Sequence, residues 1–258
     1  MNLFSRAAMA AAMIGGLAAA NGAMAQTMVD QSAEHRFQLD FHVNDAALQK
    51  MLPRGWEPVV ATQGAAKDAN LRMIFIDRVA VMGADGKPAG SGTSRLAYLA
   101  IPVKQTAGGA TGQMIIFGLT ESAADAPGAF GVYQHASIAR MSRAAAASAG
   151  AATGAEDWEF VGAAGERMEV HAEYERGPAT KGGGETKFYN PNDPSKYQIF
   201  KTEQAIDIMR NPTTTPPDHV KKFSYKAGGG KIATLFDGTE KVVSWDLFPW
   251  YVRTVSAP

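Results

Sequence analysis

The side chains best suited to acid–base or metal chemistry are the histidines and one run of acidic residues. The chain has five histidines and no HExxH motif, and four of its histidines lie on separate predicted elements: His42, His135, His171 and His219. The densest group is Glu169, His171, Glu173 and Glu175, which would share one face of a strand. Such a face could bind a cation. A solvated strand face, opposite the apolar face of the same strand, is the favoured interpretation. The sequence therefore predicts no metal site, with Glu169, His171 and Glu173 as the alternative ligands.

The sequence lacks the motifs of a serine-nucleophile enzyme and of a phosphate-binding loop. The sequence contains no Gly-x-Ser-x-Gly elbow, and Ser91 lies between two glycines in a segment typical of a turn. Residues 180–186 contain Lys181 and three glycines but lack the Walker spacing and a preceding apolar strand. No cofactor is therefore predicted.

An aromatic cluster near the C-terminus could form a partner-binding surface. It consists of Trp245, Phe248, Trp250 and Tyr251, grouped around Pro249. Exposed aromatic clusters mark interaction sites, but a terminal strand more often docks its aromatic side chains into the core. The core interpretation is favoured, and a partner surface is the alternative.

The first 25 residues predict a cleavable signal peptide. Arg6 precedes the short apolar run 7–20, and Ala23-Met24-Ala25 is a small-x-small cleavage site. The apolar run is shorter than the roughly 20 residues needed to cross a bilayer. We therefore expect a periplasmic or secreted protein, with residues 26–258 forming a single β-rich domain.

The charge balance bears on the class of partner, and the absence of cysteine bears on the source of stability. Lys and Arg number 25, Asp and Glu also number 25, and no dense basic tract is present. Such a chain offers no electrostatic reason to bind nucleic acid. With no cysteine for disulfide bonds, its stability must come from a core, which a chain of this length can supply. No later segment predicts a membrane span.

The elements that must position any site are mainly strands. The clearest is 35–43, where apolar and polar residues alternate. Further strands are predicted at 57–62, 71–81, 95–103, 113–120, 158–161, 166–176, 219–226, 231–236 and 241–245. Asn44 is expected to cap a helix at 45–52. Hairpin turns are predicted at Asp85-Gly86 and at Gly108-Gly109.

Three segments are less regular than these strands. The Ala-rich segment 134–149 predicts a second helix that ends at Gly150. Residues 177–195 predict a loop, and 196–209 fit a strand or a mixed structure. The whole pattern predicts a mainly β fold with α additions, either an antiparallel β-barrel or two sheets.

Residues 36–103 resemble the N-terminal half of the acetoacetate decarboxylase superfamily. The resemblance rests on the alternating strand Phe37–Val43, the helix at 44–52, the turn Leu52-Pro53-Arg54-Gly55-Trp56-Glu57-Pro58 and the segment Leu99-Ala100-Ile101-Pro102-Val103. A later strand running into Tyr174-Glu175-Arg176-Gly177 is compatible with it. The resemblance implies a cone-like β-barrel around a mainly apolar pocket.

The chemistry implied by that resemblance is Schiff-base formation between a lysine and a keto acid. In the superfamily a second lysine and a dry pocket lower the pKa of the reactive lysine, and an acidic residue assists. This sequence has no lysine between Lys104 and Lys181, where the pair is expected. The strand that enters Ile101-Pro102-Val103 carries no acid. We therefore expect no Schiff-base chemistry.

Three functions remain open. In the favoured one, a periplasmic barrel binds a small organic ligand, with Arg72 and Arg95 pairing a carboxylate and Tyr98, Tyr133 and His135 supplying hydrogen bonds. In the second, a lyase or hydrolase acts on a carbonyl substrate with His135 as general acid or base. In the third, the aromatic cluster docks on an envelope partner. The favoured function predicts that the five named side chains share one cavity.

Overall fold

The fold is a single twelve-stranded sheet that closes on itself. The computed structural model describes residues 26–122, 130–148, 151–210 and 218–258, so the predicted signal peptide at 1–25 lies outside the described residues. The strands are β1 (Thr27–His42), β2 (Trp56–Pro58), β3 (Leu71–Gly83), β4 (Ser94–Gln105), β5 (Thr111–Thr120), β6 (Tyr133–Ser148), β7 (Ala151–Gly162), β8 (Arg167–Glu175), β9 (Thr180–Asn190), β10 (Asp193–Arg210), β11 (Val220–Gly228) and β12 (Lys241–Ala257). The helical elements are α1 (Asp45–Gln49) and the 3₁₀ turn η2 (Gly230–Ile232). None of the described helices is long and apolar enough to cross a membrane.

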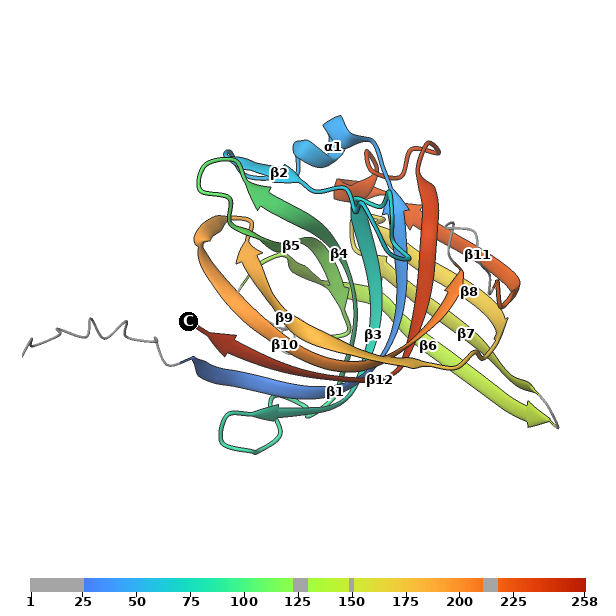
Figure 1. Cartoon of the computed structure of the whole chain (residues 1–258). Coiled ribbons are helices and arrows are strands. Elements are labelled where there is room, and N and C mark those ends of the chain that lie inside the picture. Colours follow the sequence, from blue (N-terminus) through green and yellow to red (C-terminus); the bar gives the residue numbers. More distant parts are fainter. Residues whose placement is uncertain (1–25, 123–129, 149–150, 211–217) are drawn as a thin grey trace, which may run out of the picture.

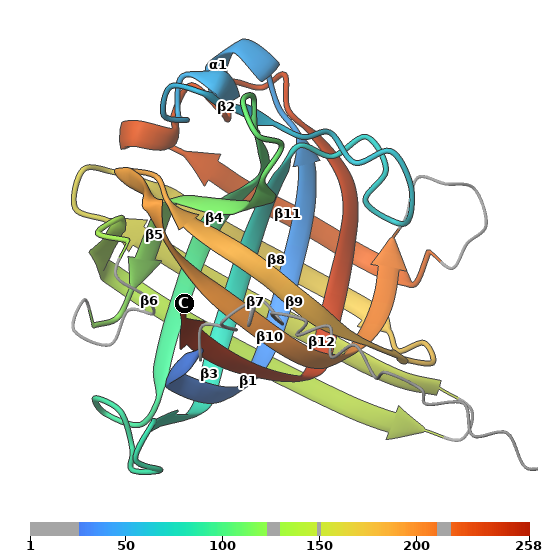
Figure 2. The same ribbon diagram turned by 60° about the vertical axis from the view of Figure 1, so that its left-hand side comes forward.

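Seven of the described strands form a closed barrel, as the sequence predicted (Figure 1). Their order around the barrel is β5-β9-β10-β12-β1-β3-β4, and β4 pairs again with β5 to close the ring. Of the other five strands, β2 pairs with β4 at the edge of the barrel. Strands β6, β7, β8 and β11 continue from β5 as a second layer, which we call the outer sheet; it crosses behind the barrel (Figure 2). Strand β5 is thus the branch point between the barrel and the outer sheet.

The junction of β5 with β9, which we call the seam, is the shortest connection in the barrel wall. Only the pairs Gln113↔Phe188 and Met114↔Tyr189 join these two parallel strands. Beside them the Tyr189 ring lies over Gly112, where a β-carbon would come within 2.8 Å of it. The same ring lies 4.6 Å from the ring of Trp56. Side-chain packing therefore supports the seam where the hydrogen-bond ladder is brief.

Alternation along β1 buries both of its faces. Odd-numbered apolar side chains such as Phe37 join a core between the barrel and the outer sheet. In that core the ring of Phe75 on β3 lies 5.9 Å from the ring of Trp158 on β7. Even-numbered side chains, including Arg36 and Gln38, point into the barrel lumen. The polar face of this strand is therefore enclosed by the closed sheet and not solvated.

Helix α1 begins where the sequence predicted. The Asn44 side chain accepts hydrogen bonds from the backbone N–H groups of Ala46 and Ala47, which satisfies two of the unpaired donors of the first turn. The predicted hairpin turns also form: Gly86, Gly108 and Gly109 have positive φ angles between antiparallel strands.

The second predicted helix is wrong, because the described part of the Ala-rich segment, residues 134–148, belongs to strand β6. Its residues pair in antiparallel register with β7 from Ala136↔Gly162 to Ser148↔Ala151. Helix propensity differs by less than 1 kcal/mol between most residues, so a long cross-strand ladder overrides it. The predicted loop at 177–195 is likewise mostly strand β9.

Two predicted strands are altered as well. Residues 231–236 form no strand, because η2 and a turn occupy this stretch. The predicted strand at 57–62 shortens to β2. The uncertain segment 196–209 is strand β10.

Candidate functional site

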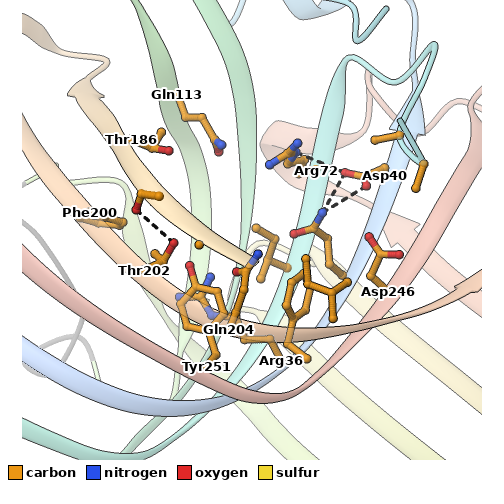
Figure 3. Close-up of a pocket in the computed structure, with 18 of the residues that line it drawn as sticks. Arg36, Asp40, Arg72, Gln113, Thr186, Phe200, Thr202, Gln204, Asp246 and Tyr251 are labelled. Atoms are coloured by element: carbon orange, nitrogen blue, oxygen red, sulfur yellow. Dashed lines mark hydrogen bonds and ion pairs between the residues drawn. The ribbon is translucent and has the colours of Figure 1, made fainter. Parts of the chain in front are cut away.

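A cavity of about 380 Å³ occupies the barrel lumen (Figure 3). Its polar lining comes from Arg36, Gln38, Asp40, Arg72, Gln113, Thr186, Thr202, Gln204 and Asp246. Its aromatic lining comes from Tyr98, Phe188, Phe200, Phe248 and Tyr251. The lining is more polar than the mainly apolar pocket that the resemblance implied. The size of the cavity is typical of small-molecule sites.

The inner end of the cavity is built on buried arginines around one glutamate. Glu34 accepts hydrogen bonds from Ser32 and from Arg36 Nε at 2.5 Å, and its Oε1 lies 3.0 Å from Arg253 Nη2. Burial alone would raise the pKa of Glu34, but Arg253 and Arg36 together lower it to about 2. Arg36 also lies 3.5 Å over the ring of Tyr251, so this guanidinium is held rigidly against the cavity.

The other end of the cavity holds an aspartate with three partners. Asp40 lies 3.4 Å from Arg72 Nε and accepts hydrogen bonds from Gln38 Nε2 at 3.1 Å and from Ser244 Oγ at 3.1 Å. Burial raises the pKa of Asp40, and Arg72, Gln38 and Ser244 oppose this shift. Arg72 is about one-third exposed, so its side chain is accessible to solvent as well as lining the cavity.

A second aspartate faces the same cavity without a partner of this kind. Asp246 is buried, and its Oδ1 has no hydrogen-bond partner in the described part of the chain. Burial and the nearby charge of Asp40 raise the pKa of Asp246 to about 8. Asp246 is therefore a neutral carboxylic acid at pH 7, able to donate a hydrogen bond into the cavity.

The cavity meets a second hollow of about 580 Å³ beside the seam. The two share Arg72, Gln113 and Thr186. These three side chains therefore border both hollows.

The structure brings together only part of the predicted site. Arg72 and Tyr98 line the cavity. Tyr133 lies just behind it, with its ring 6.4 Å from that of Tyr98 and its hydroxyl buried. Arg95 lies on the outer face of the barrel, where it pairs with Asp77 and Glu121, and His135 is exposed.

The period of a strand explains why Arg95 does not join Tyr98. Successive side chains on a strand point to opposite faces, so positions three apart cannot share one. Tyr98 pairs with Ile74 and faces the lumen, whereas Arg95 pairs with Asp77 and faces outward. The prediction that both would line one cavity is therefore wrong. The exposure of His135 likewise removes it from any role in the lumen.

The alternative metal ligands and the aromatic cluster lie elsewhere. On β8 the side chains of Glu169 and Glu173 pair with Arg167, Lys226 and Lys222, and His171 pairs with Asp157. Within the described residues no group of three or more potential ligands could hold a metal ion. The face of β8 is therefore an ion-paired surface.

Most of the aromatic cluster is buried. Trp245, Phe248 and Tyr251 are buried, and only Trp250 is substantially exposed. This agrees with the core interpretation.

The sequence reasoning missed Arg36, Asp40 and Asp246. The signal was present, because strict alternation places Arg36 and Asp40 on the face opposite Phe37. In a half-buried sheet that face would be solvated, but in a closed barrel it lines the lumen. In a barrel, the polar positions of such a strand are therefore candidates for the site.

Known structures share this fold. No protein-family model matches the sequence, and no curated protein sequence matches it. An acetoacetate decarboxylase-like enzyme from Sphingomonas wittichii RW1 matches with a TM-score of 0.52 at 11% identity, over 96% of this chain and 98% of that chain.

The enduracididine biosynthesis enzyme MppR also matches in two complexes, each with a TM-score of 0.51. Its complex with pyruvate is 12% identical over 92% of this chain and 91% of that chain. Its complex with the condensation product of pyruvate and imidazole 4-carboxaldehyde is 13% identical over 91% and 90%. This chain therefore has an acetoacetate decarboxylase-like fold.

Proposed function

We propose that this is an exported protein that binds a small organic carboxylate, such as a keto acid, in the barrel lumen without forming a Schiff base. The observation that carries the proposal is the pair of arginines that line the cavity. Arg36 and Arg72 both reach its wall, where Arg36 pairs with Glu34 and Arg72 pairs with Asp40. Guanidinium groups hold carboxylates through charge-assisted hydrogen bonds, so a small organic carboxylate matches this lining.

The proposed binding is non-covalent because the cavity offers no amine. No lysine is present among the described residues that line it. Arginine, which remains protonated, holds a carboxylate through charge-assisted hydrogen bonds but does not attack a ketone. The fold shared with MppR, whose structure was obtained with pyruvate, supports a keto acid as the ligand class.

We expect Arg72→Gln to weaken binding of pyruvate or acetoacetate at least tenfold. The change removes a partly exposed cation that lines the cavity, and charge-assisted hydrogen bonds contribute on the order of 1.5–3 kcal/mol. Isothermal titration calorimetry at pH 7 measures the affinity. Arg95→Gln is the matched control, since it removes an arginine from the outer face and should leave affinity unchanged. Equal losses in both variants, or no binding by the parent protein, would contradict the proposal.

Two further measurements test the remaining parts of the proposal. After incubation with acetoacetate and borohydride, the intact mass should show no covalent adduct, and an adduct on any lysine would overturn non-covalent binding. When the full chain is expressed in a bacterium, the periplasmic protein should have the mass of a chain that begins at Gln26. Recovery of the full-length mass from the cytoplasm alone would overturn export.

A further inference from the structure

Two carboxyl groups face one ligand cavity from adjacent strands. In the antiparallel pair β1–β12, Gln38 is opposite Asp246 and Asp40 is opposite Ser244. Asp40 and Asp246 are therefore diagonal neighbours on the lumen side, with β-carbons on the order of 7 Å apart. The carboxyl groups extend from there into the cavity (Figure 3). A single small molecule can contact both.

Their surroundings favour opposite protonation states. Asp40 has the Arg72 guanidinium and two hydrogen-bond donors, all of which stabilise a carboxylate. Asp246 has no such partner, and the negative charge of Asp40 disfavours its ionisation. Two titratable groups held apart in this way are the usual arrangement of a catalytic acid and base.

We propose that Asp246 and Asp40 form an acid–base pair that enolises a small carbonyl compound bound in the lumen, with Asp246 as the acid and Asp40 as the base. This inference rests on the proposed function, since it assumes that a keto acid occupies the cavity. The described lining residues include no histidine and no lysine that could take either role.

The proposed step is balanced in protons and electrons. Asp246 gives its proton to the carbonyl oxygen, while Asp40 removes a proton from the adjacent carbon. The electrons of that C–H bond form the carbon–carbon double bond of the enol, and those of the carbonyl π bond move to oxygen. While the enol is bound, the proton on Asp40 exchanges with one from solvent. In the reverse step Asp40 gives this solvent-derived proton to carbon, and Asp246 takes a proton back from the enol oxygen. The net result is exchange of the carbon-bound hydrogen with solvent, and no further reactant is needed.

We expect the protein to exchange the C3 hydrogens of 2-oxobutyrate in D₂O, as followed by proton NMR. A substrate held in one orientation should lose only one of its two prochiral hydrogens, whereas exchange in free solution labels both. Asp246→Asn and Asp40→Asn should each lower the rate at least 100-fold, since positioned acids and bases contribute about 10²–10⁴-fold. Asp77→Asn, on the outer face beside Arg95, is the matched control and should exchange at the parent rate.

The pH profile tests the acid without any substitution. The charged groups that act on Asp246 are Asp40 on β1, Arg72 on β3 and Asp207 on β10. Asp246 loses its proton as the pH rises through about 8, so the exchange rate should fall there after correction for the rate in buffer.

Three results would overturn the acid–base pair: calorimetric binding of 2-oxobutyrate without exchange, labelling of both hydrogens at equal rates, or unchanged rates in both aspartate variants. The first of these leaves the proposed function intact. Absence of binding would contradict the proposed function itself, so the two failures are distinguishable.

Discussion

Replacing Glu34 with glutamine is expected to lower the free energy of unfolding by about 3–5 kcal/mol at pH 7, the usual cost of breaking a buried ion pair. Glu34 is fully buried and pairs with Arg36 and Arg253, both of which are also buried. The substitution leaves these guanidinium groups without a compensating charge in the lumen. Urea unfolding followed by circular dichroism measures the loss. The matched control is Glu57→Gln, which removes a half-exposed partner of Lys104 and should cost less than about 1 kcal/mol.

The difference in free energy of unfolding between the parent protein and Glu34→Gln should depend on pH in a definite direction. In the folded protein the pKa of Glu34 is about 2, below its ordinary value of 4.5. The ionised carboxylate therefore stabilises the fold fully above pH 4.5, and this contribution is lost as the pH falls toward 2. The gap between the parent protein and Glu34→Gln should shrink over that range. A gap that stays constant from pH 5 to pH 2.5 would show that the ion pairs do not cause it.

Replacing Glu156 with alanine is expected to cost about 3 kcal/mol or more. This fully buried carboxylate accepts hydrogen bonds from His35 at 2.8 Å, from Trp158 at 2.9 Å and from Tyr174 at 2.8 Å. Each buried donor left without a partner costs about 1–3 kcal/mol. Because His35 belongs to the barrel and the other two belong to the outer sheet, the change should also loosen the contact between these layers.

Near-ultraviolet circular dichroism and urea unfolding test this expectation together. The signal of Trp158 should weaken in the variant, since its ring would no longer be fixed at the layer contact. Glu159→Ala is the control on the same strand. Glu159 faces the opposite side of β7 and is partly exposed, where it pairs with Arg140 at 3.6 Å. If both substitutions have the same effect, Glu156 does not hold the two layers together.

Local sequence signals predicted much of the barrel wall. The alternation at Phe37–Val43, the cap at Asn44 and the glycines of the hairpin turns each act through neighbouring residues, and the structure confirms them. The Ala-rich segment 134–149 failed because its conformation is decided by pairing with β7, whose sequence lies beyond that segment. Propensity is weak where a cross-strand ladder competes with it.

The site was harder to predict than the barrel wall, because it forms only when distant strands pair and close the barrel. Arg72 and Tyr98 were named as candidates and line the cavity, but Arg95 was grouped with them although its spacing from Tyr98 places it on the other face. Asp246 comes from β12, about 200 residues from its neighbour Asp40 on β1. No local pattern shows that these two carboxyl groups meet, because the pairing of the first and last strands brings them together.

At the seam, side-chain packing supplements a hydrogen-bond ladder that is shorter than elsewhere in the barrel wall. Elsewhere the circumference is fixed by long ladders, but between β5 and β9 two residue pairs carry the connection, and the Tyr189 ring is packed there between Gly112 and Trp56. Tyr189 also lines the hollow beside Arg72, so exchanging this one aromatic side chain would change the space there. Related chains could therefore diverge in the size of molecule they admit while conserving the rest of the wall.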